Sequence, residues 1–165
     1  MSSTVTTPQS AKIAAKYARL PEVKGLFEEL FRRYETLAAM QTEFIEAIKR
    51  NRAVREGKRV KISKRGKRII EEFDRDAEQA TQDIERLSQG MDDRALLTSE
   101  LSSIQQTIEF DEGMLSAWHP DDKPLAQAVI NHQREMLKLI EDFVQNSSFK
   151  GQVTSVWKGK GHART

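Results

Sequence analysis

The residues of this sequence best suited to do chemistry are the cations of one basic stretch, Lys49 to Arg68 (KRNRAVREGKRVKISKRGKR). This stretch holds eleven Lys or Arg residues and one acid, Glu56, so its formal charge is +10. Because the whole chain carries only +2, its other residues sum to −8, and the protein is a charge dipole. The eleven cations are Lys49, Arg50, Arg52, Arg55, Lys58, Arg59, Lys61, Lys64, Arg65, Lys67 and Arg68.

This density of positive charge predicts a site for a polyanion. The cations repel one another, and salt screens that repulsion only beyond about 8 Å, so the stretch needs an anionic partner or full solvation. Lys and Arg can neutralise nucleic-acid phosphates and release their counterions. The stretch contains no aromatic residue on which an unpaired base could stack. We therefore expect phosphate contacts with weak sequence preference, with DNA favoured over RNA.

Three other interpretations of the same charge stay open. The stretch could be a solvated hairpin tip, or it could bind anionic lipid at about 1 kcal/mol per cation near the surface. No Trp, Phe or Leu lies within it to insert into a bilayer, so we expect no stable membrane association. It could also bind an acidic protein, including another copy of this chain, because the remainder of the sequence is negative.

A second basic region closes the chain. Residues 146–165 lose the helical period and contain Lys150, Lys158, Lys160 and Arg164 without an acid, a net charge of +4. The sequence predicts a flexible tail that adds a second nucleic-acid contact. Its residues expected to take part are Trp157, Lys158 and Lys160, with the indole able to stack on a base.

Enzyme and metal signatures are absent from the sequence. It has no Gly-rich phosphate loop, no Gly-x-Ser-x-Gly motif and no pair of His residues four positions apart. The absence of Cys excludes a disulfide framework, a zinc ribbon and a thiol nucleophile. An acidic group matches no calcium loop and is interpreted as acids at helix ends. It comprises Glu109, Asp111, Glu112, Asp121 and Asp122. We expect no catalytic residue, metal or cofactor, and hence a non-enzymatic protein.

The elements that position the basic stretch are predicted to be helices. The chain is 38% apolar, 32% charged and only 7% aromatic, which is typical of a helical protein with charged outer faces. After an N-terminal arm over residues 1–9, a short helix from Ser10 is closed by Pro21. A long helix then runs from Pro21 to about Glu56, before Gly57. Its apolar stripe comprises Phe27, Leu30, Tyr34, Leu37, Phe44 and Ile48, with Gln41 as its one polar member.

A second long helix is predicted after Ser63, ending at Gly90. Its stripe steps regularly by three and four through Ile70, Phe73, Ala77, Ala80, Ile84, Leu87 and Met91. We expect it to pair antiparallel with the preceding helix, so that the two form a hairpin with a basic tip.

Two more helices complete the predicted fold. One begins at Asp92 or Asp93 and stops at His119 and Pro120, and the other runs from about Asp122 to Gln145. The prediction is an all-α, elongated antiparallel bundle of four long helices and one short helix. The helical domain spans residues 10–145 as a single unit.

The sequence also predicts where the protein works and leaves one other function open. It has no run of eighteen apolar residues and no secretory signal, and it lacks Cys, so we expect a soluble cytoplasmic protein. The alternative to nucleic-acid binding is a structural or adaptor coiled-coil protein of a larger assembly. In that case the apolar stripes would face a helical partner or another copy of the chain.

Overall fold

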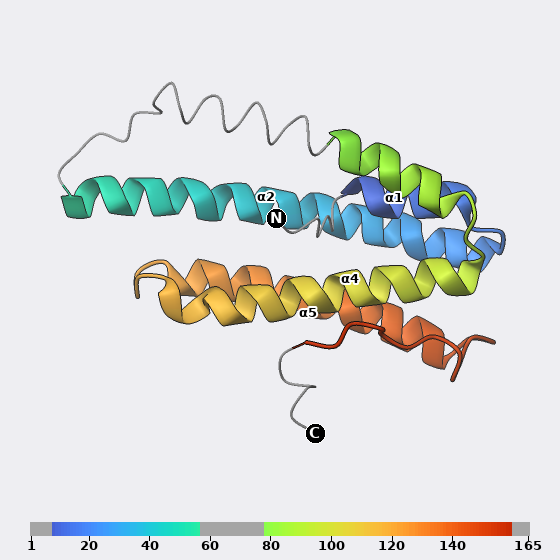
Figure 1. The fold of residues 1–165 in the computed structure, drawn as a ribbon. Coiled ribbons are helices and arrows are strands. Elements are labelled where there is room, and N and C mark those ends of the chain that lie inside the picture. Colours follow the sequence, from blue (N-terminus) through green and yellow to red (C-terminus); the bar gives the residue numbers. More distant parts are fainter. Residues whose placement is uncertain (1–7, 57–77, 160–165) are drawn as a thin grey trace.

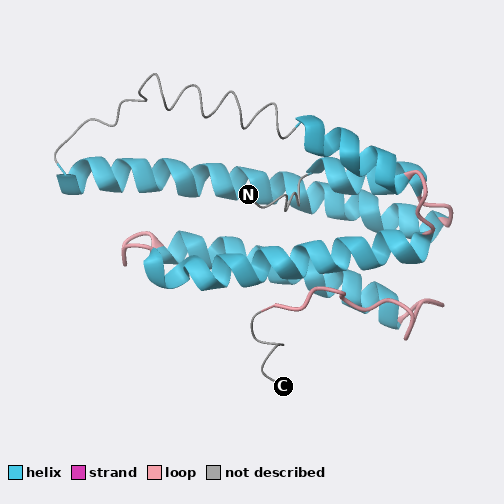
Figure 2. Ribbon diagram, viewed as in Figure 1, coloured by secondary structure: helices cyan, strands magenta, loops and turns pink. Residues whose placement is uncertain are grey.

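The computed structural model describes residues 8–56 and 78–159, and within them every regular element is a helix, with no strand (Figure 2). This confirms the all-α prediction. The elements are α1 (Pro8–Tyr17), α2 (Pro21–Glu56), α4 (Asp93–Met114), a short 3₁₀ helix η1 (Leu115–Ala117) and α5 (Lys123–Gln145). Residues 78–88 are helical as well. The predicted tip of the hairpin, within residues 57–77, lies outside the described residues.

The longest element is α2, with 36 residues, and the others are arranged along it. Pro21 stands at its start, where a missing N–H costs nothing, and Glu22 complements the positive end of the helix dipole. Figure 1 shows α1 and the helical residues 78–88 on one side of α2, and α4 with α5 on the other. The chain runs in opposite directions in α2 and α5, which pack against each other.

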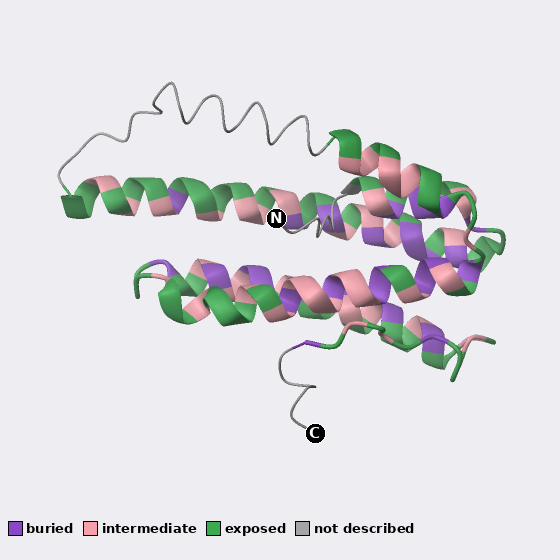
Figure 3. Cartoon of the chain, viewed as in Figure 1, coloured by how far each residue is buried: buried purple, intermediate pink, exposed green. Residues whose placement is uncertain are grey.

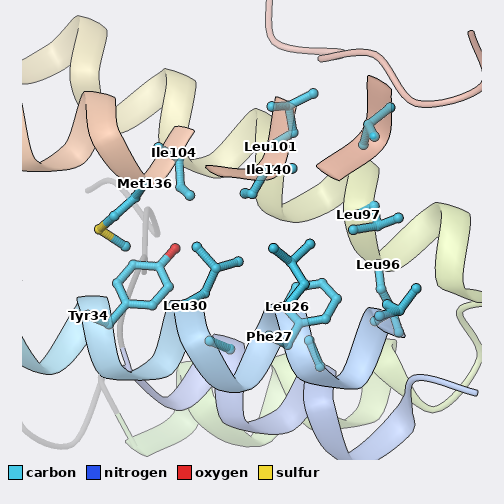
Figure 4. Close-up of a cluster of buried hydrophobic side chains, with 14 of the residues drawn as sticks. Leu26, Phe27, Leu30, Tyr34, Leu96, Leu97, Leu101, Ile104, Met136 and Ile140 are labelled. Carbon is cyan, nitrogen blue, oxygen red and sulfur yellow. The ribbon is translucent and has the colours of Figure 1, made fainter. Parts of the chain in front are cut away.

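The hydrophobic core lies along the first half of α2. Its side chains point towards those of α4 and α5, as Figure 4 shows for Leu26, Leu30 and Leu97. The buried residues of α2 are Val23, Leu26, Phe27, Leu30, Tyr34, Leu37 and Ala47, so only one of seven falls beyond residue 37. Figure 3 shows the same change from buried to exposed along the helix. The second half of α2 is therefore held by few apolar contacts.

One carboxylate determines where α1 ends. The predicted helix continued to Pro21, but α1 stops at Tyr17. The backbone N–H groups of Arg19 and Leu20 donate to Asp93 Oδ1 and Oδ2, at 2.7 and 2.8 Å. These amides bond to a side chain at the start of α4, so they do not continue the helix. Asp93 is buried, and it fastens the turn between α1 and α2 to α4.

The ends of α4 agree with the sequence in part. Asp92 caps the helix, because its side chain accepts a hydrogen bond from the N–H of Ala95 at 2.8 Å. At the other end α4 stops at Met114, and a 3₁₀ turn carries the chain to Trp118. The observed helix α4 is thus shorter than the predicted helix, which was stopped only by His119 and Pro120.

The C-terminal segment lies against α4. Residues 146–159 form turns and a stretch without regular structure, as the loss of helical period predicts, and they run beside α4 and α5 (Figure 1). Val153 is buried in the core, and the N–H of Val156 donates to Ser102 Oγ at 2.8 Å. We refer to residues 146–159 as the C-terminal strap.

The second arm of the predicted hairpin makes different contacts from those expected. Glu85 accepts hydrogen bonds from Lys16 Nζ and Tyr17 Oη at 2.7 and 3.0 Å, so residues 78–88 join α1. Leu87 was predicted to belong to the buried stripe, but 62% of it is exposed. The prediction is therefore wrong for Leu87, whereas the neighbouring Glu85 contacts α1 through hydrogen bonds.

A buried carboxyl group links three helices at the centre of the core. Glu100 of α4 accepts a hydrogen bond from Tyr34 Oη of α2 at 2.7 Å and a longer one from Ser10 Oγ of α1 at 3.4 Å. Burial raises the pKa of Glu100 to about 7, although both hydroxyl donors work against this rise. Glu100 therefore takes up its proton more readily in the folded chain than in the unfolded one.

This linkage predicts that the protein loses stability as the pH rises. A carboxyl whose folded pKa exceeds its ordinary value of 4.5 stabilises the fold most below pH 4.5, and this contribution disappears as the pH approaches 7. Between these limits the free energy of unfolding should fall by about 3 kcal/mol. Urea unfolding at a series of pH values should show this slope in the wild type. The slope should be reduced in Glu100→Gln and retained in Glu28→Gln, which changes an exposed carboxyl. Equal slopes in wild type and Glu100→Gln would contradict the assignment.

A buried amide gives a second prediction. Gln133 of α5 is only 2% exposed, and neither atom of its amide has a hydrogen-bond partner among the described residues. A buried polar group without a partner costs about 1–3 kcal/mol. Gln133→Met keeps the volume and removes the polar atoms, so it should raise the melting temperature. Gln145→Met, at an exposed position of the same helix, should change it little. A melting temperature that falls in Gln133→Met would contradict this account.

Candidate nucleic-acid interface

Four of the predicted phosphate-binding residues lie in the last two turns of α2. Lys49, Arg50 and Arg52 are exposed there. Arg52 Nε pairs with Glu56 Oε1 at 3.1 Å, one turn further along the helix. Lys49 and Arg50 form no ion pair with any residue that the structure describes. Cations in the last turns also favour helix formation, because they face the negative end of the helix dipole.

Arg55 differs from these three because its acidic partners lie outside α2, in the turn before α5. Its Nη1 lies 3.8 Å from Asp121 Oδ2, and its Nη2 lies 3.6 Å from Asp122 Oδ2. These acids immediately precede α5, where the sequence predicted a helix cap. Asp122 stands at the N-cap position, but its side chain makes no capping hydrogen bond. It accepts one from Asn51 Nδ2 at 2.7 Å instead, and it is only 2% exposed.

Asp122 therefore anchors the charged end of α2 to the start of α5. The sequence did not predict that Asn51 and Asp122 would be joined by a hydrogen bond. The Asp-Asp pair before Pro124 was visible as a helix start, but no pattern in the sequence indicated a partner about seventy positions away. Arg55 and Arg52 are thus both partly neutralised within the molecule, whereas Lys49 and Arg50 form no ion pair with the described residues.

The remaining cations of the basic stretch are not described. They are Lys58, Arg59, Lys61, Lys64, Arg65, Lys67 and Arg68, and Lys160 of the C-terminal region also lies outside the described residues. Their predicted role stays a prediction from the sequence.

Trp157 and Lys158 lie on the C-terminal strap, apart from the end of α2. The indole of Trp157 is half-buried, and its Nε1 donates to Glu109 Oε2 of α4 at 2.8 Å. A Cβ atom on Gly159 would overlap the same carboxylate, so the strap fits closely at this point. Figure 1 shows α2 and the strap on opposite sides of the pair formed by α4 and α5. Within the described residues, the end of α2 and the C-terminal strap are therefore not brought together.

The acidic residues considered for a metal each have a separate environment. Glu109 bonds to Trp157, Glu112 pairs with Arg134, and Asp121 and Asp122 face Arg55. Within residues 8–56 and 78–159 no three His, Asp or Glu side chains gather as metal ligands would.

Asp111 forms no ion pair with any residue in the part of the chain that the structure describes. Burial raises its pKa, and the nearby amide of Gln133 partly offsets this rise without meeting hydrogen-bond geometry.

No family model, curated protein or solved structure matches this chain. None of the described helices combines the length and the apolar composition that crossing a bilayer requires.

The anchor at Asp122 gives a prediction for the end of α2. Asp122→Ala removes the acceptor for Asn51 and the nearer acid for Arg55, so the protein should lose about 1–3 kcal/mol of stability. Amide hydrogens of residues 49–56 should exchange faster, because this end of the helix has few other contacts. Asp121→Asn, at the exposed neighbouring acid, should cost less than about 1 kcal/mol. Unchanged exchange over residues 49–56 in Asp122→Ala would show that the anchor does not hold the helix end.

Proposed function

We propose that this protein is a non-enzymatic nucleic-acid-binding protein that holds the phosphate backbone, with DNA favoured over RNA. The proposal rests chiefly on one observation, the eleven cations among the twenty residues from Lys49 to Arg68. Binding of this kind depends on neutralised phosphates and released counterions, so it tolerates many base sequences.

The described end of α2 supports this proposal in two ways. Lys49 and Arg50 are exposed and have no acidic partner among the described residues, so both charges are available to a ligand. The anchor between Asn51 and Asp122 holds the helix end against α5, which fixes where these charges point. Charges held in place lose less entropy when they meet a ligand.

The proposal includes the finer architecture expected from the sequence. In it, α2 and the helix that ends at residue 88 form a helical hairpin whose bend carries the basic stretch, at one end of an elongated bundle of four long helices. Residues 78–88 run opposite to α2, which is the direction that such a hairpin requires (Figure 1).

A structural or adaptor role remains the second candidate. It is favoured by apolar side chains left in solvent on the same helix, since Ile45 is 51% and Val54 is 82% exposed. A partner helix or another copy of the chain could cover them.

A salt titration tests the primary proposal. Fluorescence anisotropy with a labelled nonspecific duplex should show binding at about 50 mM salt that weakens steeply by 200 mM. Replacing Arg52, Arg59, Arg65 and Arg68 with Gln should weaken binding and flatten the logarithmic salt slope by roughly 3 to 4, at about 0.9 per phosphate contact. Arg55 is left unchanged because it also pairs with Asp121 and Asp122.

The control removes the same number of charges elsewhere. Arg19, Arg32, Arg86 and Arg94 are exposed residues outside the basic stretch, and replacing them with Gln should alter the slope much less. Absence of binding at 50 mM salt, or equal losses in the two variants, would reject the proposed interface. Light scattering tests the second candidate, which predicts a mass that rises with concentration in both variants.

A further inference from the structure

A cavity of about 430 Å³ lies between the second half of α2, the end of α4 and the first turns of α5. Its volume falls within the range of about 300–1,000 Å³ found for small-molecule sites, which commonly lie between the helices of bundles. Its walls are mainly apolar, with side chains from all three helices. The lining includes Phe44, Ile45, Phe110, Met114 and Trp118, together with the carboxyl group of Asp111.

The aromatic residues of this cavity are already arranged around it. Phe44 and Trp118 meet edge to face, with ring centroids 5.2 Å apart, so they join α2 to the chain that follows α4. Around them, Ile45, Phe110 and Met114 are 51%, 63% and 37% exposed. These large apolar side chains lose contact with water only if something enters the cavity or covers it.

Asp111 gives the cavity its chemical preference. It is the only charged residue in the lining, and no cation pairs with it among the residues that the structure describes. The neighbouring acid Glu112 has Arg134 as its partner, whereas among the described residues the amide of Gln133 is the group that acts on Asp111. A carboxylate that is partly removed from water is stabilised by a ligand that itself carries a positive charge.

We propose that this cavity binds an amphiphilic organic amine, with its ammonium group against Asp111 and its apolar body against Phe44 and Trp118. The apolar walls account for the body, and the unpaired carboxylate accounts for the charge. Aromatic faces close to the cation add a further attraction. The site is separate from the basic stretch, so it does not depend on the proposed nucleic-acid binding.

Titration with a matched series of ligands tests this site. Isothermal calorimetry of the full chain at pH 7, below the micellar concentration, compares decylamine with decanol and decanoate, which carry neutral and negative ends on the same apolar body. Decylamine should bind with one-to-one saturation and at least about tenfold more tightly than decanol, since tenfold corresponds to about 1.4 kcal/mol. Decanoate should bind least.

Variants of the lining residues test whether binding takes place in this cavity. Asp111→Asn keeps the shape and removes the charge, so decylamine should lose about tenfold in affinity while decanol changes little. Asp121→Asn, which changes an acid outside the lining, should leave both affinities unchanged. In the Trp157→Phe variant Trp118 is the only tryptophan, and its fluorescence should change and saturate with decylamine.

Three results would overturn the proposal. The first is equal affinity for decylamine and decanol, because the carboxylate would then play no part. The second is the same decylamine affinity in Asp111→Asn as in the wild type. The third is a stable dimer in sedimentation together with no binding of decylamine, which would assign the cavity to a second copy of the chain.

Discussion

The structure depends on α2, one continuous helix that must bury an apolar core at one end and expose cations at the other. The 36 residues of α2 carry the apolar core at one end and the first cations of the basic stretch at the other. Between Val23 and Leu37 the helix buries six side chains, and burial of apolar surface stabilises that half at about 25 cal/mol per Å². Beyond residue 37 only Ala47 is buried, so this half depends on other interactions.

Those other interactions are polar and specific. Asn51 bonds to Asp122, Arg55 pairs with the acids before α5, and Arg52 pairs with Glu56 along the helix. An exposed pair within a helix contributes only about 0.3–0.5 kcal/mol, so Asp122, which is buried and joins two helices, is the strongest of these contacts. A buried carboxylate without a hydrogen-bond partner would destabilise the fold. Asn51 must therefore stay beside Asp122 at the start of α5.

Buried carboxyl groups repeat this role elsewhere in the fold. Asp93 holds the turn between α1 and α2, and Glu100 brings together Tyr34 and Ser10 from two other helices. Each joins residues more than sixty positions apart in the sequence. Apolar burial is non-directional, whereas a buried carboxyl must meet its donors in a defined geometry. We interpret these groups as the features that fix how the helices align.

The sequence predicted which residues face the core more reliably than which helices pair. Spacings of three and four identified Phe27, Leu30, Tyr34 and Leu37, all of them buried, because the helical period alone determines one face. The period says nothing about the partner of that face. The contacts of residues 78–88 with α1 and the exposure of Leu87 were therefore missed.

In the candidate site, too, one feature was predicted from the sequence and another was not. Composition was enough to predict the basic stretch, since charge density needs no fold. The anchor at Asp122 was not predictable, because an acid before a helix has the same sequence pattern whether it caps that helix or bonds to another one. Val153 was likewise missed, because residues 146–165 were predicted to be a flexible tail.

The second half of α2 contributes residues to both proposed sites, and its weak burial gives a physical reason. A segment with few buried apolar contacts opens at a lower free energy than the core, so ligands can reorganise it without unfolding the protein. The cavity beside Phe44 and the cations from Lys49 onward share this half of the helix. A ligand that packs Phe44 and Trp118 more firmly would also restrain the last turns of α2, since both regions are tied to the chain between α4 and α5. The described end of α2 and the wall of the cavity thus share contacts with the chain between α4 and α5, through Asp122 and Trp118.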